Sequence, residues 1–431
     1  MRVLVLAGVL AALLVQPSVG GSLRASTAPD ELRQLLPEIR RNLETAIVGF
    51  WYPRSVDRTH GGYVIAFDRE GRRAADAPKM IVSQARMLWL SARLARAGHR
   101  RDELLEAADH GFRFLRDRMW DREHGGFYWE VDESGTRVTE PHKHLYGQAF
   151  ALYALAEYYR ASGRHEALET AERLFAVLEA RAYDRRHGGY VEFFSREWSD
   201  PPAGATSYLG PPNDAKRLNT HLHLLEAFTT LLRASPSPLV RERLQELVTI
   251  QTTTVVRNRF GACTDEHRPD WSPVLTPEAA RVSYGHDLEN IWLVDDALDA
   301  LGRSSAPLVD LYRALFAYSR RHGYDERGGG FFDSGPLGAP ADRRTKTWWV
   351  QAESLVGALT MYRLTGEPAY ADVFVQTWRW TNTAQTDWEH GEWFEAVDPD
   401  GATRGGKGHR WKTGYHNGRA LLEAIRLIEA L

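Results

Sequence analysis

The stretch Asp57-Arg58-Thr59-His60-Gly61-Gly62-Tyr63 returns along the chain, and its spacing predicts the fold. Later copies begin at Asp121, Asp184, Asp325 and Asp387, and residues 258–261 form a shortened sixth copy. Neighbouring copies start 62 to 64 residues apart, and the 141 residues between Asp184 and Asp325 hold two units. Paired glycines supply the positive φ angles of a tight turn. The sequence therefore predicts six similar units, each containing one such turn.

The segments between the turns have a helical pattern. Residues 149–159 place apolar side chains at three- and four-residue spacing, and similar patterns occupy residues 87–94, 222–232, 291–301, 355–364 and 421–431. Each unit has room for two helices and, after its turn, a short strand such as residues 190–194. Helical hairpins that cannot bury an apolar face alone must pack together. We therefore expect an all-α protein, an (α/α)6 barrel that forms a single domain over residues 22–431.

Composition excludes several classes of protein. The 431 residues include 54 basic and 57 acidic side chains, a formal net charge of -3, so no basic surface for nucleic acid is expected. Cys263 is the one cysteine in the chain, which excludes an intrachain disulfide and a cysteine-based metal cluster.

The N-terminus predicts export. Residues 3–15 form an apolar run with Arg2 before it and small residues after it, too short to span a bilayer. This pattern is typical of a cleavable signal peptide, here residues 1–21. We expect a mature protein outside the membrane, either periplasmic or secreted.

Candidate site residues lie where helices are expected to begin. Only six residues are lysines, and five of them precede segments rich in histidine or tryptophan: Lys143, Lys216, Lys346, Lys407 and Lys412. In a barrel of helical hairpins, the loops at one end frame a central cleft, so these segments are expected to converge. The histidines of the repeated turns are interpreted as turn residues: His60, His124, His187 and His390.

Two histidine pairs raise the question of a metal site. His142 with His144 and His221 with His223 have an i, i+2 spacing, which does not share a helix face, and no cysteine or fixed carboxylate spacing accompanies them. We therefore expect neither a metal nor any other cofactor.

Acid–base chemistry is the stronger prediction. His286 and Glu289 are three residues apart, so on a helix they share a face and the carboxylate can orient the imidazole, although a plain surface pair has the same spacing. His286 and His416 are candidates for a base and an acid on opposite sides of a substrate carbon.

Side chains around these histidines suit a sugar. Core packing is the alternative for Trp348, Trp349 and Trp411, but each indole also offers a flat face on which a sugar ring can stack. Arg86, Asn219 and His223 can hydrogen-bond hydroxyl groups.

Four segments carry a resemblance to a known family: residues 219–227, 284–289, 348–353 and 411–417. On the basis of these segments, the chain from about residue 35 to the C-terminus resembles the N-acylglucosamine 2-epimerase superfamily, and within it most closely the cellobiose 2-epimerases. The resemblance implies an (α/α)6 barrel and a metal-free, nucleotide-free inversion of C2 at the reducing end of β-1,4-linked disaccharides, through a cis-enediolate.

The resemblance also implies residue roles. His286 and His416 match the two catalytic histidines, and Glu289 matches the partner of the first. The implied substrate-binding positions are Arg86, Tyr146, Asn219, His223, Trp348, Trp349, Glu353 and Trp411. Gly414 departs from the family pattern, in which proline precedes Tyr-His, and is expected to loosen the loop that carries His416.

Alternative functions remain at this point. An aldose–ketose isomerase acting on mannose or glucose would use the same residues and return the proton to C1. A glycoside hydrolase on the same barrel would need two carboxylates, and Glu226, Glu289 and Glu353 are available. A non-catalytic carbohydrate-binding protein would not need the histidines. A small sugar is the expected partner, and the expected assembly is a monomer or weak dimer.

Overall fold

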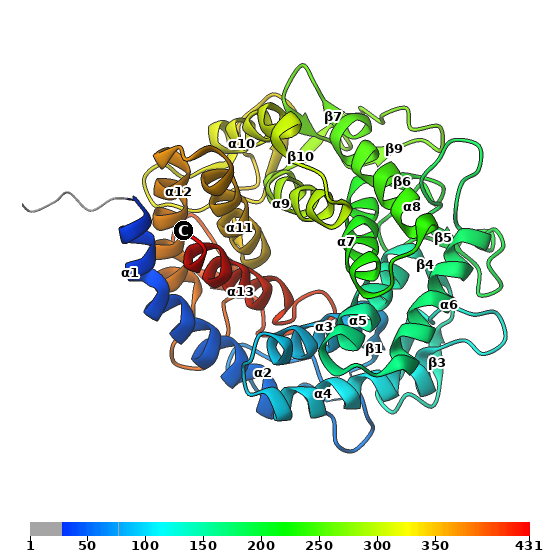
Figure 1. The fold of residues 1–431 in the computed structure, drawn as a ribbon. Coiled ribbons are helices and arrows are strands. Elements are labelled where there is room, and N and C mark those ends of the chain that lie inside the picture. Colours follow the sequence, from blue (N-terminus) through cyan, green and yellow to red (C-terminus); the bar gives the residue numbers. More distant parts are fainter. Residues whose placement is uncertain (1–27, 76) are drawn as a thin grey trace, which may run out of the picture.

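Figure 1 shows two concentric rings of helices around a central axis. The computed structural model describes residues 28–75 and 77–431, so the predicted signal peptide at residues 1–21 lies outside the described residues. The inner ring consists of α3 (Ile81–Arg96), α5 (Leu145–Ser162), α7 (Leu218–Ala234), α9 (Tyr284–Leu301), α11 (Trp348–Thr365) and α13 (Tyr415–Glu429). The outer ring consists of α1 (Ala28–Arg41) with its continuation α2 (Gly49–Arg54), then α4 (Arg101–Phe114), α6 (His165–Arg181), α8 (Pro238–Thr249), α10 (Val309–Gly323) and α12 (Pro368–Trp380). The predicted (α/α)6 barrel is confirmed.

The two rings differ in how their helices are buried. Every residue of α5 from Leu145 to Tyr158 is buried, whereas α4 buries one stripe that includes Leu104, Ala108 and Phe112. A helix that is apolar all round belongs inside, and an amphipathic helix covers it. The six apolar stretches singled out in the sequence lie in inner helices, except that the last one runs two residues past the end of α13, and one hydrophobic core runs around the ring. No helix among the described residues has the length and apolar composition needed to cross a membrane.

Short antiparallel strands gather at the end of the ring where the inner helices begin. The strands are β1 (Lys79–Met80), β2 (Glu130–Val131), β3 (Val138–Glu140), β4 (Lys143–His144), β5 (Phe193–Phe194), β6 (Lys216–Arg217), β7 (Val256–Arg257), β8 (Ala262–Cys263), β9 (Glu266–His267), β10 (Arg281–Ser283), β11 (Ser334–Pro336), β12 (Lys346–Thr347), β13 (Ala396–Val397) and β14 (Thr403–Arg404). Their sheets are β1-β2-β3, β4-β5, β6-β9, β7-β8, β10-β11 and β12-β13-β14. The expected strand at residues 190–194 is shorter than predicted, because only Phe193 and Phe194 pair with a neighbouring strand.

Each repeated turn connects an outer helix to the next inner helix, and a buried lysine holds five of the six turns, all but the shortened copy at residues 258–261. In the first copy, Gly61 and Gly62 have φ angles of 88° and 68°, and Oδ1 of Asp57 accepts the amides of Thr59 and His60. Oδ2 of Asp57 accepts from Nζ of Lys79 at 2.8 Å. Four later copies repeat this ion pair: Lys143–Asp121, Lys216–Asp184, Lys346–Asp325 and Lys407–Asp387.

These contacts explain the residues that the sequence singled out. The lysines fix turns, and Lys412 likewise binds the buried Glu392. The amides of His124, His187 and His390 bind their turn aspartates, as the amide of His60 does. The four turn histidines are therefore local turn residues.

Candidate active site

The structure brings the predicted site residues together at the end of the ring where the inner helices begin. Arg86 lies on α3, Tyr146 on α5, Asn219 and His223 on α7, His286 and Glu289 on α9, Trp348, Trp349 and Glu353 on α11, Trp411 just before α13 and His416 on α13. All but Trp411 lie within the first two turns of an inner helix. Because all inner helices begin at the same end of the ring, these residues lie at that end. Residues that are 325 positions apart thus become neighbours; Arg86 Nη1 donates to the carbonyl of Trp411 at 2.8 Å.

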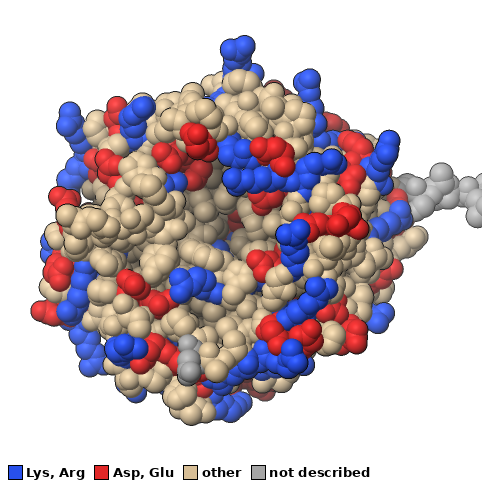
Figure 2. All heavy atoms as spheres, turned by 180° about the vertical axis from the view of Figure 1, so that it is seen from behind, with Lys and Arg blue, Asp and Glu red and all other residues tan. Residues whose placement is uncertain are grey.

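One face of the ring is hollowed at its centre (Figure 2). Acidic and basic side chains are mixed around the rim on that face, without a surface of one sign. A rim of this kind suits a neutral polar ligand better than a polyanion.

His286 is held by packing. Its ring lies 4.7 Å from the ring of Trp349, centroid to centroid, and the Trp349 indole leaves no room for a Cβ on Gly285. Burial lowers the pKa of His286 to about 4, so the imidazole is neutral at neutral pH and can accept a proton.

His416 is held by a carboxylate. Its Nδ1 lies 2.7 Å from Oε1 of Glu353, so Nδ1 carries the proton and Nε2 is left to react. Burial, together with the positive charges of Arg86 and Arg419, lowers the pKa of His416 well below its ordinary value. The Trp349 ring lies 5.9 Å from the His416 ring, so this one indole contacts both histidines.

The carboxylate pairing differs from the expected one. Oε1 of Glu289 accepts from Arg419 Nη2 at 2.6 Å, and no hydrogen bond joins Glu289 to His286 among the described residues. The i, i+3 spacing puts both side chains on one face, but the Arg419 guanidinium attracts the carboxylate more strongly than a neutral imidazole can.

Arg419 is the centre of a buried charge cluster that the sequence did not reveal. Its guanidinium binds Glu226, Glu289 and Glu353, and all four side chains are at most 3% exposed. The hydroxyl of Tyr415 donates to Glu226 at 2.8 Å. Arg419 stands three residues after His416 on the same predicted helix, and that spacing is the signal that would have identified it.

One guanidinium does not neutralise three carboxylates. Burial, with the charge of Glu353, raises the pKa of Glu289 to about 7, and burial also raises the pKa of Glu353. Burial opposes ionisation of Glu226 too, but Arg419 and His223 lower its pKa below the ordinary value. Glu289, Glu353 and His416 are close enough to ligate one metal ion, yet the Arg419 guanidinium binds both carboxylates there.

Arg86, Tyr146 and His223 form a chain of contacts near the N-terminal ends of α3, α5 and α7. Arg86 Nη2 donates to the Tyr146 hydroxyl at 3.1 Å, and the Tyr146 and His223 rings meet edge to face at 5.2 Å. The backbone amide of Asn219 binds Asp265, whereas its side-chain oxygen has no hydrogen-bond partner within the described part of the chain. These groups are fixed by neighbours and leave polar atoms for a ligand.

The tryptophans differ in exposure. Trp349 and Trp411 are half-buried, and Trp348 is 7% exposed. Trp349 and Trp411 therefore present more ring surface to a ligand than Trp348 does.

The histidine pairs have structural partners. His221 Nε2 accepts the amide of Tyr190, and its Nδ1 donates to the carbonyl of Arg217. Gln84, Gln148 and Gln351 bind the equivalent amide in other units, so His221 replaces a structural glutamine. His223 Nδ1 binds Glu226, and His144 Nε2 binds Ser207, which leaves neither pair arranged as metal ligands.

Gly414 has a packing role. A Cβ at this position would lie 2.6 Å from the Trp51 indole, whose Nε1 donates to Glu392. The loop that carries His416 is thus tightly packed at Gly414, contrary to the expectation of a looser loop.

Comparisons with known proteins agree with this geometry. The family model described as N-acylglucosamine 2-epimerase (GlcNAc 2-epimerase) matches residues 61–420. The chain is 32% identical to a cellobiose 2-epimerase of Bacteroides fragilis, over 91% of this chain and 98% of the relative. The solved structure of a cellobiose 2-epimerase from Spirochaeta thermophila DSM 6192 superposes with a TM-score of 0.84 at 37% identity, covering 95% of this chain and 99% of the other. A D-mannose isomerase of Marinomonas mediterranea is 25% identical over 88% of this chain and 95% of the relative.

Proposed function

Because the chain belongs to the N-acylglucosamine 2-epimerase family and is a carbohydrate 2-epimerase, we propose that it inverts C2 at the reducing end of a β-1,4-linked disaccharide of the cellobiose type. One observation carries the proposal: His286 and His416, both neutral at rest, lie against the same indole, Trp349, at ring-centroid distances of 4.7 Å and 5.9 Å. Two such imidazoles suit proton removal from one face of a carbon and return to the other.

The reaction begins with ring opening, because only the open-chain aldehyde makes the C2 proton acidic. One histidine then takes that proton, and the electron pair of the C–H bond moves toward the carbonyl to give a cis-enediolate. The other histidine, after taking up a proton from solvent, delivers it to the opposite face of C2, and the electron pair returns to form the C–H bond of the epimer. The proton held by the first histidine is then released to solvent. Delivery to C1 instead would give the ketose.

Arg86 is the proposed stabiliser of the enediolate. Its positive charge contributes to the low pKa of His416. When the enediolate oxyanion pairs with Arg86, its negative charge offsets the positive charge of Arg86. The proton affinity of His416 therefore rises at the step in which His416 holds a proton. The six inner helices also direct their N-termini at the cleft, and these positive dipole ends favour a developing negative charge.

The cluster around Arg419 is proposed to support the imidazolium. Its three carboxylates outnumber one guanidinium, and Glu353 contacts His416 directly. A protonated imidazole next to surplus negative charge is stabilised electrostatically, which offsets part of the desolvation cost.

Trp349 and Trp411 are the proposed stacking surfaces for the two sugar rings, with Tyr146, Asn219 and His223 as hydroxyl partners. Residues 1–21, interpreted as a signal peptide, support a location outside the cytoplasm, where fragments of cellulose or mannan are available. Hydrolysis is disfavoured, because Glu226, Glu289 and Glu353 all bind Arg419 and none pairs with another across an open cleft.

The test replaces each histidine by asparagine, which keeps a polar side chain but cannot shuttle a proton near neutral pH. His286→Asn and His416→Asn should each lower kcat by about a hundredfold or more, in both reaction directions, with little change in Tm. Retention of more than about a tenth of the wild-type rate by either variant would contradict the two-histidine assignment.

A further inference from the structure

A cavity of about 290 Å³ lies beside His286. Its wall is formed by the first residues of α7, α9 and α11 together with β6, β8, β9, β10 and β11. His286 and Trp349 are the two predicted site residues that line it, and His416 does not. The cavity therefore adjoins the cleft at one of the two histidines.

The wall of this cavity is polar. Aspartate, glutamate, arginine and serine make up ten of its fifteen lining residues. Glu278 and Arg343 in the wall are exposed, so the cavity reaches the protein surface, whereas Asp287 in the same wall is 1% exposed. A polar cavity of this size has room for several water molecules.

Two buried groups in the wall lack a protein partner. Oδ1 of Asp287 accepts the amide of Cys263, but its Oδ2 has no hydrogen-bond partner among the described residues. Nε of Arg281 is likewise without a partner in that part of the chain. Buried polar groups are almost always hydrogen-bonded, either to protein or to ordered water. Water is the partner that a polar cavity open to the surface offers these two groups.

Asp265 is the carboxylate of this cavity that acts on His286. Its Oδ1 accepts the amide of Asn219, and its Oδ2 lies 3.3 Å from Nη1 of Arg217, so the side chain is held at the wall. Burial lowers the pKa of His286, and the negative charge of Asp265 opposes that effect. The Asp265 side chain is 42% exposed, so it can exchange a proton with bulk water.

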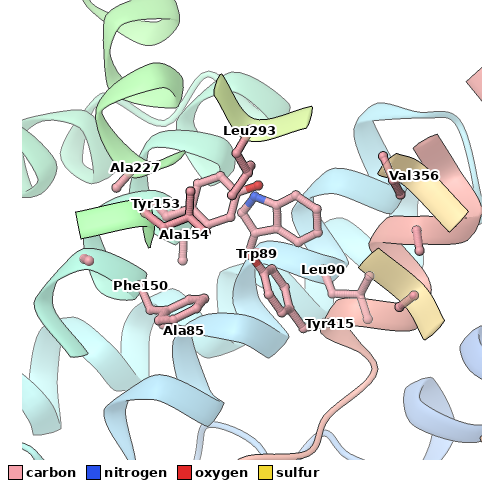
Figure 3. Packing of buried hydrophobic residues seen from close by; sticks show 14 of the residues in the cluster. Ala85, Trp89, Leu90, Phe150, Tyr153, Ala154, Ala227, Leu293, Val356 and Tyr415 are labelled. Carbon is pink, nitrogen blue, oxygen red and sulfur yellow. The ribbon is translucent and has the colours of Figure 1, made fainter. Parts of the chain in front are cut away.

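His416 has different surroundings. It is 6% exposed, and its Nδ1 is bound to Glu353. Figure 3 shows Tyr415, the residue before it, among Trp89 and Phe150, with ring centroids 5.2 Å and 5.5 Å from that of Tyr415. Rings packed this closely leave no space for water between them. A sugar in the cleft would therefore cut His416, but not His286, off from solvent.

We propose that the cavity beside His286 is the route by which this histidine exchanges its proton with solvent while a sugar occupies the cleft, and that Asp265 accepts the proton on this route. The N–H bond of the imidazolium breaks, a cavity water takes the proton and passes it to the Asp265 carboxylate, and bulk water removes it. The imidazole is left neutral and regains a proton by the reverse route. This proposal rests on the two-histidine reaction proposed above.

Exchange at C2 in D2O tests the route, with cellobiose and its C2 epimer as separate substrates. At low conversion, NMR measures deuterium at C2 of the unreacted sugar, which reports a proton that was removed, exchanged and replaced on the same face. The direction in which His286 removes the proton should show about tenfold or more exchange per inversion than the opposite direction, because His416 returns the proton it took.

The two histidine variants assign the direction. His416→Asn retains the histidine beside the cavity, so it should exchange the C2 proton of one epimer for deuterium without inverting it. His286→Asn retains the shielded histidine, so it should exchange the C2 proton of the other epimer about tenfold more slowly or less.

Replacement of Asp265 tests the carboxylate. Asp265→Asn keeps an acceptor for the amide of Asn219 but cannot carry the proton. In the direction that starts at His286, its ratio of exchange to inversion should fall about tenfold, toward the ratio of the opposite direction. Asp310→Asn, a matched change at an exposed aspartate on α10, should keep the wild-type ratio.

Equal exchange in the two directions, or equal exchange by the two histidine variants, would overturn the cavity route and leave the two-histidine reaction intact. The histidine comparison decides this even if Asp265→Asn does not fold. A wild-type ratio in Asp265→Asn would overturn the role of Asp265. Absence of both inversion and exchange at C2 in the wild type would instead contradict the proposed function, and this proposal with it.

Discussion

His416 and His286 are held in different ways, and the difference matters for catalysis. Glu353 fixes the ring orientation and the protonated nitrogen of His416, whereas His286 is held by the face of Trp349. Replacing Trp349 therefore removes one contact with each histidine, in addition to any contact with substrate.

The three tryptophans at the site are predicted to have different roles, two in substrate binding and one in stability. Trp349→Ala and Trp411→Ala should raise KM for a disaccharide while leaving Tm nearly unchanged, because both indoles are half-buried at the cleft. Trp349→Ala should also lower kcat, because this indole contacts both histidines. Trp348→Ala should instead lower the free energy of unfolding by about 3 to 5 kcal/mol, the usual effect of truncating a buried aromatic. Steady-state kinetics and thermal unfolding of the three variants measure this. A loss of stability for Trp349→Ala as large as that for Trp348→Ala would contradict the stacking role.

Glu289 is predicted to make stability depend on pH. Its pKa is about 7 in the folded protein against an ordinary 4.5, so the folded state binds the proton more tightly than the unfolded state does. The stabilisation is fully present below about pH 4.5 and is lost as the pH rises through about 7. Relative to Glu289→Gln, which keeps an acceptor for Arg419, the wild type should lose about 3 kcal/mol of unfolding free energy across this window. Denaturant unfolding at several pH values measures the difference, and a flat difference would contradict the assigned pKa.

At the scale of elements, the repeated turn depends on its lysine. Lys79 and Asp57 are at most 2% exposed, so Lys79→Met leaves a buried carboxylate without its main partner. We expect a loss of about 3 kcal/mol or more of unfolding free energy.

Arg58 provides the matched control on the same turn. Its contact with Glu106 is exposed, so Arg58→Met should cost at most about 1 kcal/mol. The double variant Asp57→Asn/Lys79→Met should be less unstable than the sum of its single changes, because no charge is then left unpaired. Equal effects of Lys79→Met and Arg58→Met in denaturant unfolding would show that the lysine does not hold the turn.

The sequence predicts these elements well because the repeat is local. Gly61 and Gly62 mark a turn, and the apolar pattern of residues 149–159 marks a helix, without reference to the rest of the chain. The role of Lys79 was not predicted, because its partner Asp57 lies 22 residues away across the turn and the following strand. Likewise, His286–Glu289 was expected from spacing on one helix, whereas the observed His416–Glu353 pair joins two helices 63 residues apart.

At the scale of the whole molecule, the ring separates two environments. The inner helices begin at the cleft with the two histidines and end around a cavity lined by arginines and carboxylates, and the Arg419 cluster lies between them. Sequence patterns identified which segments would meet at the cleft, since each precedes or opens an inner helix. They did not identify Arg419, because its partners come from α7, α9 and α11 and meet only when the ring closes.

The central claim is proton transfer at C2 of an open-chain sugar, and NMR of the protein with cellobiose in D2O tests it most directly. The account predicts a new mannosyl-type reducing-end signal with deuterium at C2, and no reaction of methyl β-cellobioside, whose ring cannot open. A ketose product would indicate that the proton returns to C1. Consumption of the methyl glycoside, or release of glucose with the C2 proton retained, would contradict the account, because a locked acetal cannot form an enediolate.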